Sequence, residues 1–172
     1  SLQSWSSSLV DYASNCDQKA ALSYWANLEK EKFDKIPVDK EHGSNTEESA
    51  RTVCVSLNEN ITQAFLRKVP KIYNTQVHDI LMLALLKAFD LWRGITSLVV
   101  DLEGHGREEI AQDIDVSRTI GWFTTIFPVS LKLNKQASLG EIIKDVKEQI
   151  HSVPKRGFDY LTLKYLNNEK PA

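Results

Sequence analysis

Residues 98–102 (Leu-Val-Val-Asp-Leu) have the composition of a β-strand and lead directly into residues 103–108 (Glu-Gly-His-Gly-Arg-Glu), and this junction constrains the fold more than any other part of the sequence. Gly104 and Gly106 allow a sharp turn at the strand end and a close approach to the backbone. Further along, residues 118–124 (Arg-Thr-Ile-Gly-Trp-Phe-Thr) again combine glycine with charged and aromatic side chains. Because both segments adjoin consecutive predicted strands, we predict that their side chains converge on one cleft.

Glu103 stands where the predicted strand leaves the sheet, and we predict that it is an acid/base group. A carboxylate in a partly dehydrated site can exchange protons near neutral pH. His105 and Arg107 could tune that carboxylate or hold an anionic or carbonyl group. The structural alternative is an ion pair between Glu103 and Arg107 that braces the turn, with His105 solvated. Strand core is likewise the ordinary role of an aromatic pair such as Trp122 and Phe123.

The first part of the chain is predicted to be helical. Apolar residues recur at helical spacing over residues 2–13 and again over residues 21–28, where Asp17 is a candidate N-cap. Residues 29–50 are polar and charged, which predicts a long exposed loop.

Residues 53–57 alternate between apolar and polar side chains, and this pattern predicts a half-buried strand. Ser56 and Glu59 have the spacing of a capping box, so we expect a helix there that ends before Pro70.

The middle of the chain is predicted to form an apolar core helix that opens at Thr75 and stops at Gly94. The face expected to be buried consists of Val77, Ile80, Leu81, Ala84, Leu85, Ala88 and Leu91. Strands are expected over residues 95–102 and 121–133, with Pro128 breaking or edging the second one.

The last part of the chain is again helical. Ser138 and Glu141 have capping-box spacing, and an apolar face continues from Ile142 until Pro154. A short helix is expected over residues 158–166. Because helices and strands intermix without a repeat of fixed period, the predicted fold class is α/β or α+β.

Composition narrows the function classes. With 172 residues and 42% hydrophobic content, the chain is long enough for one domain with a substantial core. A formal net charge of -2 argues against a general binder of nucleic acid or of membrane surfaces. Cys16 and Cys54 lack metal-type spacing, and no apolar run is long enough to span a bilayer. These features predict two free thiols that are buried or half-buried, no membrane segment and a cytoplasmic location.

Several site types lack support in the sequence. His42, His78, His105 and His151 have no metal-ligand spacing, so no metal site is predicted. No Gly-x-Ser-x-Gly elbow is present, and the glycines around His105 do not complete a dinucleotide or phosphate-binding motif.

Segments 103–108 and 118–124 closely resemble two signature motifs of the epimerization domains of non-ribosomal peptide synthetases, which are relatives of the condensation domains. Residues 79–84 look like the family's Asp-x-Leu-Leu-x-Ala helix, and residues 154–160 resemble its Pro-x-x-Gly-x-Gly-Tyr motif, with Asp159 in place of the second glycine. The resemblance runs through nearly the whole chain in the family's order. Condensation domains proper usually differ at the first two motifs, so the epimerization branch is favoured.

The resemblance implies the chloramphenicol-acetyltransferase-like fold, in which two lobes meet across a tunnel. A complete domain is more than twice this length, so the chain would hold the end of the first lobe and much of the second. Residues 1–30 would then be helices at the lobe junction, residues 31–50 an exposed loop and residues 51–172 the second-lobe portion. The family's His-His-x-x-x-Asp-Gly motif belongs upstream, and this chain alone is expected to be inactive.

The function implied by the resemblance is L-to-D epimerization at the α-carbon of a carrier-bound aminoacyl or peptidyl thioester. Glu103 would be one acid/base group. His105, Arg107, Trp122, Phe123 and Thr124 would support it or line the substrate and phosphopantetheine tunnel, and we further hypothesise that Arg107 positions Glu103 or a neighbouring carboxylate. No cofactor of its own is expected, since 4'-phosphopantetheine is carried by the partner carrier protein.

Two alternatives stay open. One is a condensation-type acyltransferase that forms an amide. The other is a catalytically silent lobe that docks a carrier protein or serves as a scaffold. The expected partners are a carrier protein domain, the remainder of the epimerization domain and the other synthetase modules, with no nucleic acid and no membrane.

Overall fold

The fold is known from a computed structural model, which describes residues 1–15, 19–44, 46–110 and 114–166. The chain divides into two compact units that interleave along the sequence. Unit 1 comprises residues 1–33, 98–131 and 148–172, and unit 2 comprises residues 34–97 and 132–147. The predicted N-cap Asp17 and the predicted free thiol Cys16 lie outside the described residues. Cys54 is free, as predicted, but it is exposed and not buried or half-buried as expected.

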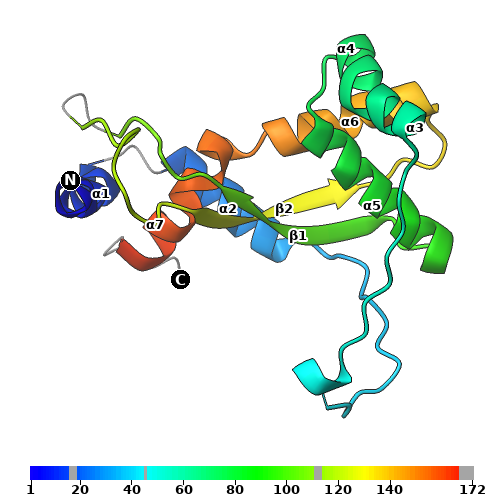
Figure 1. Ribbon diagram of the computed structural model, residues 1–172. Helices are drawn as coiled ribbons and strands as arrows, with labels where there is room; N and C mark the ends of the chain where they lie inside the picture. Colours follow the sequence, from blue (N-terminus) through cyan, green and yellow to red (C-terminus); the bar gives the residue numbers. More distant parts are fainter. Residues whose placement is uncertain (16–18, 45, 111–113, 167–172) are drawn as a thin grey trace. The chain divides into compact units, whose positions relative to one another are not determined.

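Unit 1 contains helices α1 (Leu2–Asn15), α2 (Lys19–Lys30) and α7 (Phe158–Leu166), with both α1 and α2 in contact with α7. All three helices were expected from the sequence. A short helical turn, η3 (Pro154–Gly157), leads directly into α7 (Figure 1).

The described strands, β1 (Ser97–Gly104) and β2 (Thr125–Lys132), form a two-stranded sheet and lie side by side in Figure 1. They are antiparallel, because the Leu133 amide donates to the Thr96 carbonyl at 2.8 Å while Gly104 lies against Thr125 at the opposite end. The strand predictions are confirmed, although the second strand begins later than expected. Pro128 is tolerated within β2 because a strand in a two-stranded sheet has a free edge.

Alternation along the two strands separates a buried face from a partly exposed one. Leu98, Leu102, Phe127, Val129 and Leu131 are buried and share one face. Val99 and Ile126 lie on the opposite face and remain 40% and 42% exposed.

The core of unit 1 includes an aromatic cluster. Trp5 of α1 packs edge-on against Phe123, with ring centroids 5.7 Å apart, and against Phe158 of α7 at 6.2 Å. Val116 completes the buried set, and Tyr12 packs against Phe158 at 5.7 Å. Burial of this aromatic area and the edge-to-face geometry both favour the folded state. The cluster therefore fixes residues 116–123 against α1 and α7.

Unit 2 begins with an extended segment that carries the short turn η1 (Glu47–Ser49) and continues to helix α3 (Glu59–Gln63). The predicted half-buried strand over residues 53–57 is wrong, because Val53, Val55 and Leu57 are 89%, 94% and 60% exposed and no strand is assigned there. Alternation alone cannot create a strand without a neighbouring strand to pair with. The predicted cap Ser56 is also wrong, since the Asn58 side chain accepts the Ile61 amide at 2.9 Å.

The prediction that this helix ends before Pro70 is wrong. The helix continues through η2 (Ala64–Lys68), which has π-helical hydrogen bonding, into α4 (Val69–Tyr73). Proline lacks an amide hydrogen and clashes with the carbonyl one turn earlier in a regular helix. A π-bulge changes the hydrogen-bonding register and removes that conflict. The helix ends instead at Asn74, which adopts the left-handed conformation.

Helix α5 (Val77–Arg93) has the predicted end but a different buried face. Gly94 caps it with φ +71°, and its amide donates to the Asp90 carbonyl at 2.8 Å. The buried residues are Asp79, Leu83 and Leu86, whereas Leu81 and Leu91 of the predicted core face are 50% and 81% exposed. Apolar residues occur on most sides of this helix. The periodicity therefore predicted a wide apolar face, and the centre of that face was placed on the wrong side of the helix.

Helix α6 (Leu139–His151) follows the sequence prediction at its start and along its buried face. Ser138 donates from its amide and from its hydroxyl to Glu141, each at 2.7 Å, and thus forms the expected capping box. Ile142, Ile143 and Val146 are buried. The polar face of α6 left only one side able to pack, which explains why its orientation was predictable.

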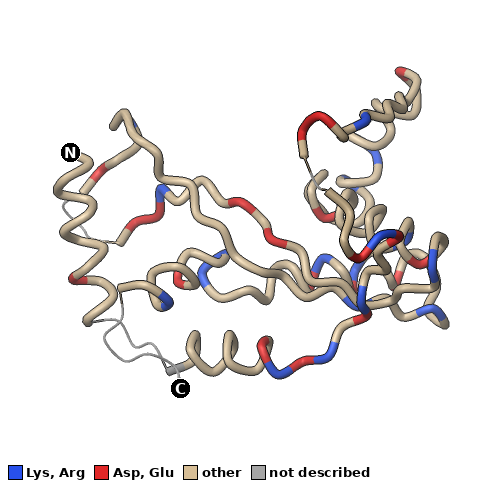
Figure 2. The backbone as a smooth tube through the Cα atoms, turned by 90° about the horizontal axis from the view of Figure 1, so that it is seen from below, with Lys and Arg blue, Asp and Glu red and all other residues tan. Residues whose placement is uncertain are grey.

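Charged residues of both signs are distributed along the chain. Lys and Arg positions are interspersed with Asp and Glu along the described chain (Figure 2). Among the described residues, no helix is both long enough and apolar enough to cross a membrane.

Candidate functional site

The turn after β1 brings the two signature segments into direct contact. Gly106 has φ +66°, and a Cβ atom placed there would lie 1.5 Å from the Phe123 carbonyl oxygen. A side chain at this position is therefore excluded both by conformation and by space. Segments 103–108 and 118–124 therefore meet at Gly106 and Phe123, but their side chains do not converge on one cleft as predicted, because His105 and Arg107 line one cavity and Trp122, Phe123 and Thr124 line another.

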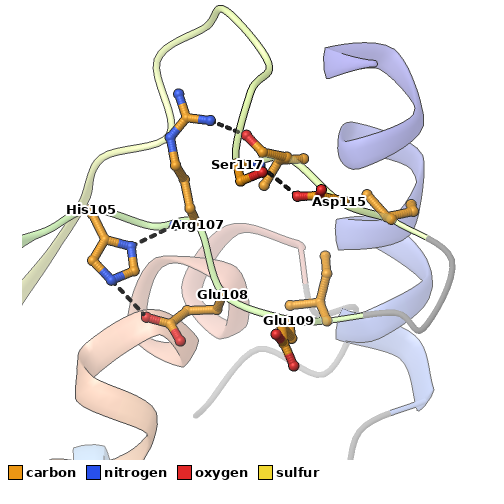
Figure 3. A pocket seen from close by; sticks show the side chains of 9 residues that line it. His105, Arg107, Glu108, Glu109, Asp115 and Ser117 are labelled. Atoms are coloured by element: carbon orange, nitrogen blue, oxygen red, sulfur yellow. Dashed lines mark hydrogen bonds and ion pairs between the residues drawn. The ribbon is translucent and has the colours of Figure 1, made fainter.

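Arg107 ties the same two segments together (Figure 3). Its guanidinium donates to the Val116 carbonyl and, at 3.0 Å, to the Thr119 carbonyl. It also lies over the Phe123 ring, 4.1 Å from the centroid. A guanidinium is planar and carries several donors, so it can bind two carbonyls and at the same time stack on an aromatic ring.

The contacts of Arg107 differ from those expected. We predicted an acidic partner, either Glu103 or a neighbouring carboxylate, but both recorded side-chain hydrogen bonds of Arg107 go to carbonyl oxygens. The alternative ion pair between Glu103 and Arg107 is not present among the described residues either. The guanidinium binds the Thr119 carbonyl and a second acceptor position of the Val116 carbonyl, which also accepts the Thr119 amide at 3.1 Å. A carbonyl oxygen has two lone pairs and can accept both donors.

His105 forms a short polar chain with its neighbours. Its Nδ1 accepts the Arg107 amide at 2.9 Å, and its Nε2 lies 3.6 Å from a Glu108 carboxylate oxygen (Figure 3). An imidazole that accepts at Nδ1 carries its proton at Nε2. The ring is thus held in one orientation, with its donor directed at Glu108.

A cavity of about 810 Å³ lies beside this turn. It is lined by His105, Arg107, Glu108, Glu109, Ile110, Ile114, Asp115, Val116 and Ser117. The Ser117 amide donates to Asp115 at 2.8 Å, and this hydrogen bond lowers the pKa of Asp115 from its ordinary value. The cavity is therefore bordered by the carboxylates of Glu108, Glu109 and Asp115.

A second cavity of about 760 Å³ is lined by Gly106 and Phe123, the two residues in contact at the turn. Its wall combines residues of α1 and α7 with Trp122, Phe123 and Thr124. Most of the lining side chains are aromatic or aliphatic, with threonine hydroxyls among them. This composition is typical of sites that bind small organic groups.

The three candidate residues of the second segment have different environments. Phe123 is buried, Thr124 is half-buried, and Trp122 is 85% exposed. All three precede β2 and line the second cavity. Neither Trp122 nor Phe123 is therefore a core residue of a strand, which is the ordinary role of an aromatic pair. Trp122 is exposed, and Phe123 belongs to the core but lies in the turn before β2.

Glu103 is the last residue but one of β1 and is exposed. It lies on the same face as Val99 and Ile126, opposite the buried face that carries Leu102. It lines neither of the two cavities. We expected Glu103 at a cleft, but the alternation of the strand directs it to the partly exposed face instead.

Sequence reasoning missed the groups that hold the turn. The carbonyls of Val116 and Thr119 carry no side-chain signal, so no motif could have identified them. Glu108 could have been identified, because it follows His105 at a spacing of three residues within the same motif. Among the described residues, no group of three or more His, Cys, Asp or Glu side chains could hold a metal ion.

Comparison with known proteins identifies the class of domain. The family described as the condensation domain matches residues 2–172. The chain is similar to one of the proteins that make up the linear gramicidin synthase of Brevibacillus parabrevis, with 41% identity over 165 residues that cover 96% of the chain and 2% of that protein. It is also similar to tyrocidine synthase 1 of the same organism, with 37% identity over 96% of the chain and 15% of that protein.

A solved structure supports the same assignment. The crystal structure of the epimerization domain from the third module of tyrocidine synthetase B matches with a TM-score of 0.85 and 36% identity, over 97% of this chain and 37% of that one. The chain therefore belongs to the condensation domain family and has the condensation-domain fold. Its resemblance to the epimerization domains of non-ribosomal peptide synthetases is confirmed, and it spans only a small part of the synthetases it matches.

Proposed function

We propose that the domain containing this chain epimerizes the α-carbon of an aminoacyl or peptidyl thioester, from L to D, while the substrate is attached to a carrier protein. The main support is the match to a solved epimerization domain at 36% identity, which includes the β1 end that carries Glu103. The 4'-phosphopantetheine arm of the carrier belongs to the substrate in this proposal, and the location is the cytoplasm.

Epimerization requires removal of a proton next to the thioester carbonyl and return of a proton to the opposite face. Glu103 serves as one acid/base group, because a carboxylate can accept a proton from carbon or deliver one to it. A second group outside this chain serves the other face. The negative charge that develops on the thioester oxygen needs a hydrogen-bond donor or a positive group nearby.

The exposed position of Glu103 is compatible with this role. The chain spans 37% of the solved epimerization domain, so most of a complete domain lies outside these residues. We propose that the remainder of the domain covers the face of Glu103, Val99 and Ile126 and forms a substrate tunnel there. Trp122, Phe123 and Thr124 line or support that tunnel, whereas His105 and Arg107 hold the turn beside it.

The test uses the complete domain with a carrier protein loaded with an α-deuterated aminoacyl group. In Glu103→Gln, wash-out of deuterium is expected to fall by about 10²–10⁴-fold, which is the usual contribution of an acid/base group. Glu48→Gln is the matched control, because Glu48 is an exposed carboxylate that belongs to η1 and not to the proposed tunnel face of β1. Wash-out by Glu103→Gln at the parental rate would exclude Glu103 from the mechanism.

A second candidate is amide formation by a condensation-type acyltransferase, which the family match to the condensation domain favours. The same assay separates the two functions. An epimerase exchanges the α-hydrogen without an acceptor, whereas an amide-forming enzyme requires an acceptor amine and leaves the α-deuterium in place.

A further inference from the structure

Asp159 differs from the glycine found in the related motif and is almost completely buried, with 2% of its surface exposed. A buried carboxylate requires hydrogen-bonding or charged partners. The Tyr12 hydroxyl of α1 donates to Asp159 Oδ1 at 2.6 Å, and Lys155 Nζ lies 3.8 Å from Oδ2. Lys155 also donates to the Tyr12 hydroxyl and lies over the Tyr12 ring at 4.6 Å. We call Tyr12, Lys155 and Asp159 the polar triad.

The polar triad adjoins an unusual turn. Lys155, Arg156 and Gly157 have φ values of 43°, 52° and 78°, so three consecutive residues adopt the left-handed conformation. Residues with a side chain avoid this region, and such a turn persists only where surrounding contacts hold it. Lys155 belongs both to this turn and to the polar triad. The triad therefore supplies contacts that hold the strained turn.

The same turn packs against the sheet beside the end of β1. A Cβ atom at Gly157 would lie 1.9 Å from Cγ of Phe127, so this glycine rests directly on the Phe127 ring. The Arg156 carbonyl oxygen lies 4.0 Å from the position of a Cβ atom at Gly104. The Phe127 ring, on which Gly157 rests, lies 3.6 Å from the same position at Gly104. Because Gly104 follows Glu103 in β1, the turn is coupled through Phe127 to the strand end that carries Glu103.

We infer that Tyr12, Lys155 and Asp159 are positioning residues that fix the strand end presenting Glu103. The inference rests on the proposed function, because it assigns the triad a role in placing the acid/base group. Asp159 acts only through the turn and is not a catalytic residue. A triad that served stability alone would leave the chemical step unchanged.

The experiment measures α-deuterium wash-out and thermal unfolding of the complete domain for Tyr12→Phe, Asp159→Asn and the double variant. Each single variant is expected to lower kcat by about tenfold to a hundredfold with little change in KM, since a small misplacement of a reacting group has effects of this size. The double variant is expected to be no slower than the slower single variant, because the two residues act as one unit. Asp159→Asn keeps an oxygen acceptor and a similar volume, so the fold is retained.

Tyr24→Phe is the matched control. Tyr24 is a partly buried tyrosine of α2 whose hydroxyl interacts with Ser152, and it therefore reports the loss of a hydroxyl that bonds to no member of the triad. Its kcat is expected to remain at the parental value.

Two results would overturn the inference. The first is lower thermal stability with an unchanged kcat, which would give the triad a purely structural role. The second is that the effects of Tyr12→Phe and Asp159→Asn on kcat multiply in the double variant, which would show that the two residues do not act together. If the complete parental domain shows no wash-out, the proposed function itself fails. If Glu103→Gln retains wash-out at the parental rate, Glu103 is excluded from the mechanism and the positioning role fails with it. If Glu103→Gln abolishes wash-out and the triad variants do not change kcat, only the present inference fails.

Discussion

The two ends of strand β1 are each held by a charged side chain from outside the strand, but the two attachments differ in burial and chemistry. At the start, the exposed Asp34 carboxylate accepts the Thr96 amide at 2.8 Å and the Ser97 amide at 3.1 Å. Just past the end, the half-buried Arg107 guanidinium donates to two carbonyls and covers an aromatic ring. At the start of β1 the attachment is Asp34, a titratable acceptor that is exposed to water. Past its end the attachment is Arg107, a permanently charged donor that packs against an aromatic ring.

The comparison indicates where the fold around β1 depends most on individual residues. A hydrogen bond in contact with water contributes little net free energy, because water can replace either partner. Half-buried polar groups lose more when one partner is removed, and the cation over Phe123 adds to the difference. Substitutions at the Arg107 end should therefore have larger effects than substitutions at the Asp34 end.

The largest effect is expected for Gly106→Ala. The left-handed conformation costs a residue with a side chain about 1–2 kcal/mol, and forcing a methyl group against the Phe123 carbonyl adds about 1–3 kcal/mol or more. We therefore expect unfolding of the complete domain by denaturant to show a loss of about 3 kcal/mol or more, or no folded protein at all.

Gly94→Ala provides the control for this prediction. Gly94 has φ +71°, close to that of Gly106, but no atom lies within 4 Å of the position of its Cβ. Only the conformational cost applies there, and a loss of about 1 kcal/mol is expected. Equal losses for the two variants would show that contact with Phe123 does not matter.

A smaller effect is expected for Arg107→Met, which removes two charge-assisted hydrogen bonds and the contact with Phe123. Loss of these contacts should lower the free energy of unfolding by about 2–3 kcal/mol. Amide hydrogen exchange at residues 114–124 should accelerate, because this segment loses its attachment to the turn.

Arg93→Met tests whether any arginine next to an aromatic ring has this effect. Arg93 lies 5.2 Å from the Trp92 ring centroid at the exposed end of α5, and its removal should change stability by less than about 0.5 kcal/mol. If Arg107→Met were as mild as Arg93→Met, the packed attachment would contribute no more than a surface contact.

These two ends also show what could be predicted from the sequence. Arg107 was identified because it stands in a motif that combines glycine, histidine and acidic residues, but its partners are backbone carbonyls, which have no sequence signature. Asp34 lies in a polar segment that resembles any exposed loop, and its partners are 62 and 63 residues away. Sequence patterns identify unusual side chains more readily than the distant backbone groups that they bind.

The same limit applies to whole elements. Helix α6 has one apolar face and a local capping box, so its orientation and its start followed from the sequence. Helix α5 is apolar on most sides, and residues 53–57 alternate without a paired strand, so their predicted faces were wrong. Glu103 was predicted at the strand end, where it lies, but its exposure depends on which face of β1 the rest of unit 1 covers.

The smallest effect is expected for Asp34→Asn, and it should depend on pH. The Thr96 amide, followed by the Ser97 amide, lowers the pKa of Asp34 below its ordinary value of 3.8. A carboxyl group whose pKa is lower in the folded state stabilises that state above its ordinary pKa, and the contribution disappears as the pH falls through the folded-state value. The difference in thermal stability between the parental domain and Asp34→Asn should therefore be constant at neutral pH, begin to fall near pH 3.8 and vanish only below the lower folded-state pKa.

Asp39→Asn separates this hydrogen-bonded attachment from a general effect of charge, because it removes the same charge from the same extended segment. The difference between the parental domain and Asp39→Asn should not follow the pH profile of Asp34→Asn. Added salt should alter both differences only slightly if backbone hydrogen bonds dominate at Asp34, since screening acts on separated charges. An Asp34→Asn profile that is flat with pH would mean that this end of β1 is held by the rest of the sheet and not by the carboxylate.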